Sequence, residues 1–113
     1  MHEMSLAQNI LDIVLATAGQ HSVQKVLSVS ICAGELRGIV PEQIQFCFGL
    51  LTKDSIAKGA ELQVNTVAIK ARCKACSKEF PVKEFRFICP ACDHAELETL
   101  QGLELLVENI EVL

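Results

Sequence analysis

The sequence lacks several features that would place it in common classes of protein. It contains no Trp and no Tyr, and its five aromatic residues are all Phe. No apolar run approaches the roughly 20 residues that a membrane-spanning helix needs. The net charge is −4, from 14 acidic and 10 basic residues, which argues against a general binder of polyanions. Paired carboxylates, a phosphate-binding loop and a nucleophile–base pair are also missing, so we do not expect an enzyme.

The N-terminal segment lacks the features of a secretion signal. A signal needs a basic first region and an unbroken apolar stretch. Here Glu3 is acidic, and Asp12 interrupts the apolar positions. We therefore expect a cytoplasmic protein, in which thiols stay reduced. Six cysteines in such a compartment require an explanation other than disulfides.

Two segments have the apolar spacing of helices. The 113 residues, half of them hydrophobic, fit one compact domain with a small module. A first helix is predicted from Met4 to Ala18, with Ser5 and Gln8 as a capping box and Gly19 as its end. A second helix is predicted to begin at Pro41, which suits the first helical position. One face of it carries Ile44, Cys47, Phe48 and Leu51.

Three segments are predicted to be strands. Leu62–Ile69 is one of them. Leu103–Leu113 also fits a helix, but its β-branched residues favour a strand. The first of the three, residues 23–31, alternates with period two and places on one face Val23, Leu27, Val29 and Ile31.

These elements predict an α+β fold in which two helices cover one face of a small three-stranded sheet. A zinc-ribbon module is inserted between two of the strands. Residues 1–70 plus 97–113 would form the main domain. Residues 71–96, called the cysteine module below, would form the second.

The cysteine module contains two C-x-x-C pairs, Cys73–Cys76 and Cys89–Cys92, with 12 residues between them. Each pair can aim two thiolates at one ion, and four thiolates are the tetrahedral set that structural zinc takes. The segment is too small to fold on its own core, so metal binding must stabilise it by about 10–16 kcal/mol. Two disulfides and a rubredoxin-like iron centre are the alternatives, and the reduced compartment disfavours the first.

The remaining cysteines and histidines have simpler interpretations. Cys32 and Cys47 lie among apolar neighbours and are interpreted as buried core residues. His21 is expected in a solvated turn. His94, two residues after Cys92, is interpreted as a surface histidine, although it could replace a thiolate in some state.

The N-terminus begins Met1-His2-Glu3. Taken alone, His2 is most simply a frayed tail residue. Its chemistry is nevertheless suited to a metal, because the Met1 amine, the His2 backbone nitrogen and the His2 imidazole can close adjacent chelate rings. The Glu3 amide or carboxylate would complete a square plane. Nitrogen-rich square-planar sites suit Ni(II) or Cu(II).

Over its whole length the chain resembles the HypA family of hydrogenase maturation factors, which includes HybF. The resemblance rests on the opening Met-His-Glu, the Ile31–Glu35 segment, the Phe46–Phe48 segment, Gly59 and both C-x-x-C pairs. It implies a nickel metallochaperone in which His2 anchors nickel beside Glu3 and the four cysteines hold zinc.

The resemblance also implies a HypB-type GTPase as partner and delivery to the large-subunit precursor of a nickel–iron hydrogenase. Some similar proteins serve urease. Some relatives carry a histidine directly after a C-x-x-C pair, whereas here those positions are Ser77 and Asp93, which puts a zinc-linked pH response in doubt. Edge strands of a small sheet can pair between copies, so a homodimer is a candidate.

The alternative function is a zinc-ribbon module that binds nucleic acid or protein. Residues 70–86 hold six of the ten basic residues and would be its footprint. The four thiolates and the acidic remainder of the chain oppose this interpretation. We expect no nucleic acid and no membrane as partner.

Overall fold

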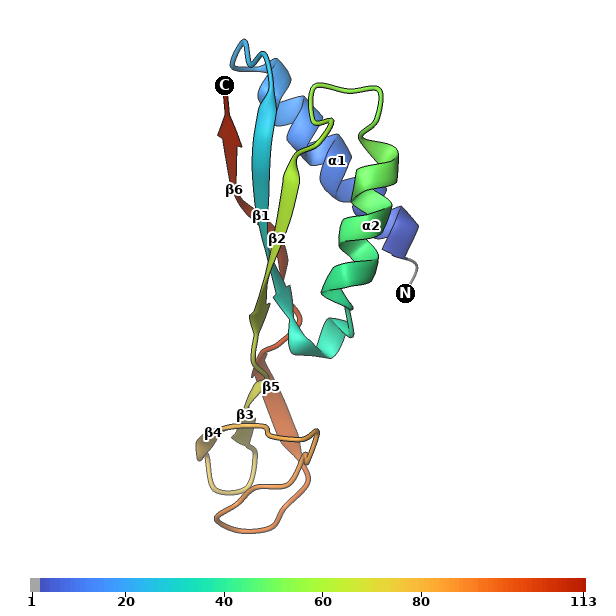
Figure 1. Cartoon of the computed structure of the whole chain (residues 1–113). Coiled ribbons are helices and arrows are strands. Elements are labelled where there is room, and N and C mark those ends of the chain that lie inside the picture. Colours follow the sequence, from blue (N-terminus) through green and yellow to red (C-terminus); the bar gives the residue numbers. More distant parts are fainter. Residues whose placement is uncertain (1–2) are drawn as a thin grey trace.

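The computed structural model describes residues 3–113, and these form an elongated molecule of 55 × 25 × 16 Å (Figure 1). One end holds two helices and a three-stranded sheet, and the other holds a second, smaller three-stranded sheet with the cysteine loops. The predicted α+β arrangement is thereby confirmed. The elements are α1 (Glu3–Gly19), β1 (Val26–Gly34), a 3-10 helix (Glu35–Arg37), α2 (Pro41–Leu51), β2 (Glu61–Val67), β3 (Lys70–Cys73), β4 (Glu79–Pro81), β5 (Leu97–Gln101) and β6 (Leu105–Val112).

β1 is the central strand of the larger sheet. It pairs in parallel with β2 and antiparallel with β6, in the order β2-β1-β6. The chain leaves this sheet after β2, builds the smaller sheet, and returns as β6. The prediction of a module inserted between two strands is therefore confirmed, and the ambiguous C-terminal segment is a strand.

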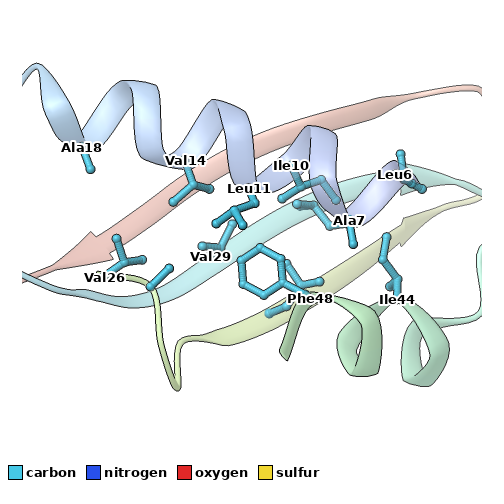
Figure 2. Close-up of a cluster of buried hydrophobic side chains, with 13 residues drawn as sticks. Leu6, Ala7, Ile10, Leu11, Val14, Ala18, Val26, Val29, Ile44 and Phe48 are labelled. Atoms are coloured by element: carbon cyan, nitrogen blue, oxygen red, sulfur yellow. The ribbon is translucent and has the colours of Figure 1, made fainter. Parts of the chain in front are cut away.

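Both helices pack on the same face of the larger sheet, and their apolar stripes meet there (Figure 2). From α2, Ile44 and Phe48 are buried as predicted, with Cys47 and Leu51 partly buried against them. Pro41 begins α2, and Gly19 ends α1. The core so formed is mainly aliphatic, and it draws from α1 the residues Leu6, Ala7, Ile10, Leu11, Val14 and Ala18.

Two local predictions for this part are wrong. Ser5 lies inside α1, which already begins at Glu3, so it cannot cap the helix; Gln8 instead donates to Asp12 at 2.8 Å. Leu27 is 43 % exposed, whereas Val26 is fully buried. The pairing of β1 with β6 shifts register between Val26 and Ser28, and this bulge turns Leu27 away from the core.

The smaller sheet has its own apolar cluster. Its strand order is β4-β3-β5, and its buried residues are Ile69, Ala71, Cys73, Phe80, Val82 and Cys89. The sequence pattern assigns residues 97–113 to the main domain. In the structure, residues 97–101 are β5 and pair with β3, so the strand pairing of the smaller sheet reaches to Gln101. The division at 71–96 stays a prediction.

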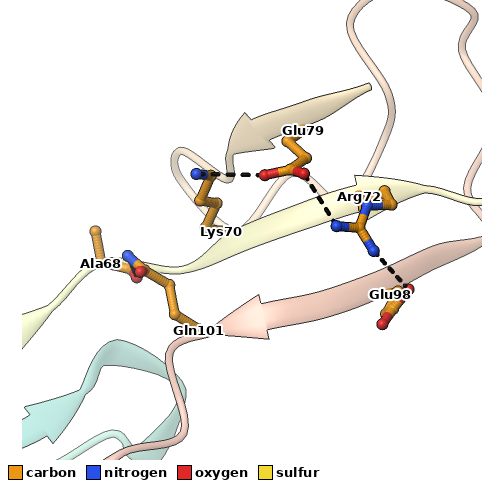
Figure 3. A network of polar contacts seen from close by, with 6 residues as sticks. All are labelled: Ala68, Lys70, Arg72, Glu79, Glu98 and Gln101. Atoms are coloured by element: carbon orange, nitrogen blue, oxygen red, sulfur yellow. Dashed lines mark hydrogen bonds and ion pairs between the residues drawn. The ribbon is translucent and has the colours of Figure 1, made fainter. Parts of the chain in front are cut away.

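Ion pairs link the strands of the smaller sheet to one another, and a side-chain hydrogen bond links β5 to the segment that leads from β2 into β3. Arg72 on β3 bridges Glu79 on β4 at 3.0 Å and Glu98 on β5 at 3.5 Å, and Lys70 also pairs with Glu79 (Figure 3). The Gln101 side-chain amide donates to the carbonyl of Ala68 at 2.9 Å.

At the junction the two sheets touch through glycine. The N–H of Leu36 donates to the carbonyl of Gly102 at 2.9 Å, and the N–H of Gly34 donates to that of Glu104 at 2.7 Å. A Cβ atom on Gly34 would overlap the carbonyl group of Gly102. This close approach requires glycine.

Candidate metal centre

The first C-x-x-C pair sits where β3 ends. The N–H of Ser77 donates a hydrogen bond to the carbonyl of Cys73 at 2.9 Å. The N–H of Cys73 donates to the carbonyl of Lys78, also at 2.9 Å. This turn requires a left-handed backbone at Ser77, whose φ is 65°. It returns Cys76 to the side of Cys73, and the N–H of Ala75 donates to Cys73 Sγ at 3.3 Å.

The second pair uses the same turn. The N–H of Asp93 donates a hydrogen bond to the carbonyl of Cys89 at 2.9 Å. The N–H of Cys89 donates to the carbonyl of His94, again at 2.9 Å. Asp93, like Ser77, is left-handed, with φ 62°. Aspartate tolerates this conformation better than most residues. Two sequence-distant pairs are thus aimed by one repeated hydrogen-bond pattern.

The structure brings the four sulfur atoms of the predicted ligands together. Cys73 Sγ lies 3.5 Å from Cys92 Sγ, Cys76 Sγ lies 3.6 Å from Cys89 Sγ, and all four lie within 4.8 Å of one another. Four sulfurs bound tetrahedrally at about 2.3 Å from zinc would be about 3.8 Å apart. All four are free thiols, so the disulfide alternative is not what the structure contains. The donor set fits Zn(II).

The electrostatics of the cluster favour a bound cation. Burial raises the pKa of Cys89, but N–H groups of Ala91 and Cys92 outweigh it, and the pKa is lowered to about 7. The N–H of Cys76 likewise lowers the pKa of Cys73. A backbone hydrogen bond from His94 acts the same way on Cys92, yet burial and the other three thiols raise the pKa of Cys92 to about 12. The hydrogen bonds of the turns therefore favour the thiolate form of Cys73 and Cys89. A bound cation is needed to keep all four cysteines deprotonated together.

His94 is exposed, as interpreted from the sequence, but its ring contacts the cluster. Its Nδ1 lies 3.2 Å from Cys92 Sγ. The ring nitrogen is therefore close enough to hydrogen-bond a sulfur that binds metal. The spacing of two residues after Cys92 was the signal that could have predicted this contact.

In the part of the molecule that holds the two helices, Glu3 is the first described residue of the predicted nickel site. It begins α1, is half-buried, and lines a hollow of about 350 Å³ together with Glu42, Phe46 and Cys47 of α2. Met1 and His2, the other predicted ligands, lie outside the described residues. Glu42 was not predicted as a site residue from the sequence, and it shares this hollow with Glu3 because α1 packs on α2.

The two remaining cysteines are not fully buried. Cys47 packs against the core from α2 and is half-buried. Cys32 is also half-buried, but it lies on the sheet face away from the helices, because Ile31 and Ala33 on either side of it point inward and are buried. Burial raises the pKa of Cys32, and the nearby carboxylates of Glu108 and Glu104 raise it further.

Comparisons with known proteins agree over the whole chain. A family model described as "Hydrogenase/urease nickel incorporation, metallochaperone, hypA" matches residues 1–112. The hydrogenase maturation factor HypA of Desulfitobacterium hafniense (strain DSM 10664 / DCB-2) is 40 % identical over 112 residues, covering 99 % of this chain and 98 % of that protein. HypA of Geobacter metallireducens is 39 % identical, covering 99 % of each. The solution structure of the Ni metallochaperone HypA from Helicobacter pylori has the same fold, with a TM-score of 0.71 at 23 % identity, covering 100 % of this chain and 98 % of that one. The chain therefore belongs to the HypA family.

Proposed function

We propose that this chain binds Ni(II) at its N-terminus and passes it to the large-subunit precursor of a nickel–iron hydrogenase, as a carrier without catalysis of its own. The family match carries the proposal, because it runs from residue 1 to residue 112 and its description names nickel incorporation. The same description includes urease, so urease is the second candidate client.

The proposed nickel ligands are the Met1 amine, the His2 backbone nitrogen, the His2 imidazole and Glu3. A site at the start of α1 lies at the positive end of the helix dipole, which disfavours a cation. The carboxylates of Glu3 and Glu42, which line one hollow, offset this effect. Such a balance gives moderate affinity, which suits a carrier that must release its metal.

The zinc bound by Cys73, Cys76, Cys89 and Cys92 is proposed to be structural. Four thiolates leave no open coordination position for a substrate. Cys73 and Cys89 also belong to the buried cluster of the smaller sheet, so the metal and that cluster stabilise the same element.

The partners follow from the transfer step. We assign a HypB-type GTPase to the exposed face of α1, where Gln8, Asn9 and Asp12 are all exposed near Glu3. None of the helices in residues 3–113 has the length and apolar content of a membrane span. The cytoplasm is the proposed location, because the thiolate cluster requires reducing conditions.

The nickel site is tested by moving the amine without changing any side chain. A variant with one Ser added before Met1 and the variant His2→Ala should both lose Ni(II) binding in isothermal titration calorimetry. His21→Ala is the matched control, because His21 is exposed in the turn after α1. All three should keep one zinc per chain. If the extended protein and His2→Ala bind nickel as tightly as the parent, the site lies elsewhere, and His94 becomes the next candidate.

A further inference from the structure

The loop of residues 83–88 in the cysteine module exposes three large apolar side chains to solvent. Phe85, Phe87 and Ile88 are 58 %, 37 % and 47 % exposed. The two phenyl rings lie with centroids 6.4 Å apart. Glu84 and Phe85 are both left-handed, with φ 54° and 56°, which is uncommon for a bulky aromatic residue. Burial does not explain this strain, because Phe85 is mostly in solvent.

A hollow of about 280 Å³ lies beside this loop. Its apolar lining includes Pro81, Ile88 and Pro90, and its charged lining consists of Lys83, Arg86 and Asp93. Because Cys89 also lines it, the turn that holds the metal ligands fixes one wall. The hollow is therefore pre-formed whenever the metal is bound.

The charge beside the hollow is available to a ligand. The two cations that lie within the strands of the smaller sheet, Lys70 and Arg72, are paired with Glu79 and Glu98 (Figure 3). By contrast, Lys83 and Arg86 form no ion pair within residues 3–113. Two unpaired cations and one carboxylate leave the lining formally positive.

We propose that this hollow and the loop of residues 83–88 are a docking site for a segment of a partner protein that combines carboxylates with an apolar side chain. The carboxylates would pair with Lys83 and Arg86, and the apolar side chain would enter between Ile88 and the prolines. Arginine and aromatic residues, phenylalanine among them, are enriched in protein interfaces. This site is distinct from the nickel site, because Glu3 begins α1 beside the larger sheet, whereas the hollow lies in the cysteine module.

Nucleic acid is the less favoured occupant. Outside residues 70–96 the chain holds ten acidic and four basic residues, so a long polyanion would be repelled by most of the molecule. The four thiolates reduce the positive potential of the module itself. A short acidic peptide needs only the local cations and the hollow.

The probe is a short fluorescein-labelled peptide rich in Glu that also carries Leu, titrated with zinc-loaded full-length protein and followed by fluorescence anisotropy. Two comparison ligands have the same charge: a peptide with Ser in place of Leu, and single-stranded oligothymidine. The Leu-containing peptide should bind most tightly. Arg86→Glu and Phe85→Ser should each weaken it by about tenfold, the loss expected for a central interface residue.

Lys58→Glu is the control, because Lys58 is exposed in the main domain and far from the hollow. Zinc content and circular dichroism establish that each variant is folded. Equal binding of the Ser peptide, tighter binding of oligothymidine, or unchanged affinity in Arg86→Glu and Phe85→Ser would overturn the proposal. So would salt-sensitive self-association that Arg86→Glu removes, because the occupant would then be a second copy. His2→Ala, which tests the nickel site, should leave peptide binding unchanged.

Discussion

At the residue scale, Ser77 and Asp93 show how one backbone conformation prepares a metal site. Each directly follows a C-x-x-C pair, and each takes a left-handed φ so that its N–H reaches the carbonyl of the first cysteine. Neither side chain needs to touch the metal. A histidine at these positions would have to adopt the same conformation, which histidine tolerates better than most residues.

Gly34 and Gly49 give opposite predictions for the same substitution. Gly34→Ala should lower the free energy of unfolding by roughly 1–3 kcal/mol, because its Cβ would overlap the backbone of Gly102. Gly49→Ala should raise it by about 0.5–1 kcal/mol, because Gly49 lies in α2 with open space around it. Urea unfolding followed by far-ultraviolet circular dichroism measures both, since the chain has no Trp or Tyr fluorescence. A stabilised Gly34→Ala would mean that the two sheets can separate at their junction.

At the element scale, the exposed face of α1 is where we expect the GTPase partner. Asp12→Lys should weaken the complex several-fold without loss of folding, because rim charges act mainly on association. Asp54→Lys is the matched control, since Asp54 is exposed in the segment after α2. Surface plasmon resonance against the purified GTPase measures both variants. Undiminished binding by Asp12→Lys, or equal loss in the control, would move the interface away from α1.

Elements defined by local patterns were predictable from the sequence. Helical spacing, Pro41 and Gly19 located both helices, and the spacing within each cysteine pair located four thiols that do meet. Elements that depend on distant partners were not. Leu27 was misplaced because the bulge arises from pairing with β6. The smaller sheet was not predicted because β3 and β4 are short and rich in charged residues. In addition, β3 pairs with β5, and the whole cysteine module separates these two strands in the sequence.

The predicted nickel site shows the same limit. Glu3 was predicted from the opening tripeptide, whereas Glu42 was not. The two residues line one hollow only because α1 packs on α2. The spacing of residues in the sequence does not predict that contact. The apolar lining of the same hollow, from Phe46, also depends on this packing.

At the scale of the whole molecule, two apolar clusters are joined by a narrow waist (Figure 1). Cys73→Ser should therefore abolish zinc binding and unfold the smaller sheet, which loses metal stabilisation on the order of 10–16 kcal/mol, while the helices and larger sheet stay folded. Cys32→Ser should keep its zinc, because Cys32 lies outside the cluster of four thiols. Zinc stoichiometry and amide NMR spectra report on the two parts separately. Loss of the helical signals in Cys73→Ser would show that the parts unfold as one.

The order in which the strands and the four cysteines follow one another along the chain has a consequence for biosynthesis. β1 and β2 emerge from the ribosome early, but the other edge of β1 stays open until Leu105–Val112 has been made. The last zinc ligand, Cys92, precedes β6 in the chain. Domains fold as their chain emerges. All four thiols are therefore synthesised before the strand that closes the principal sheet.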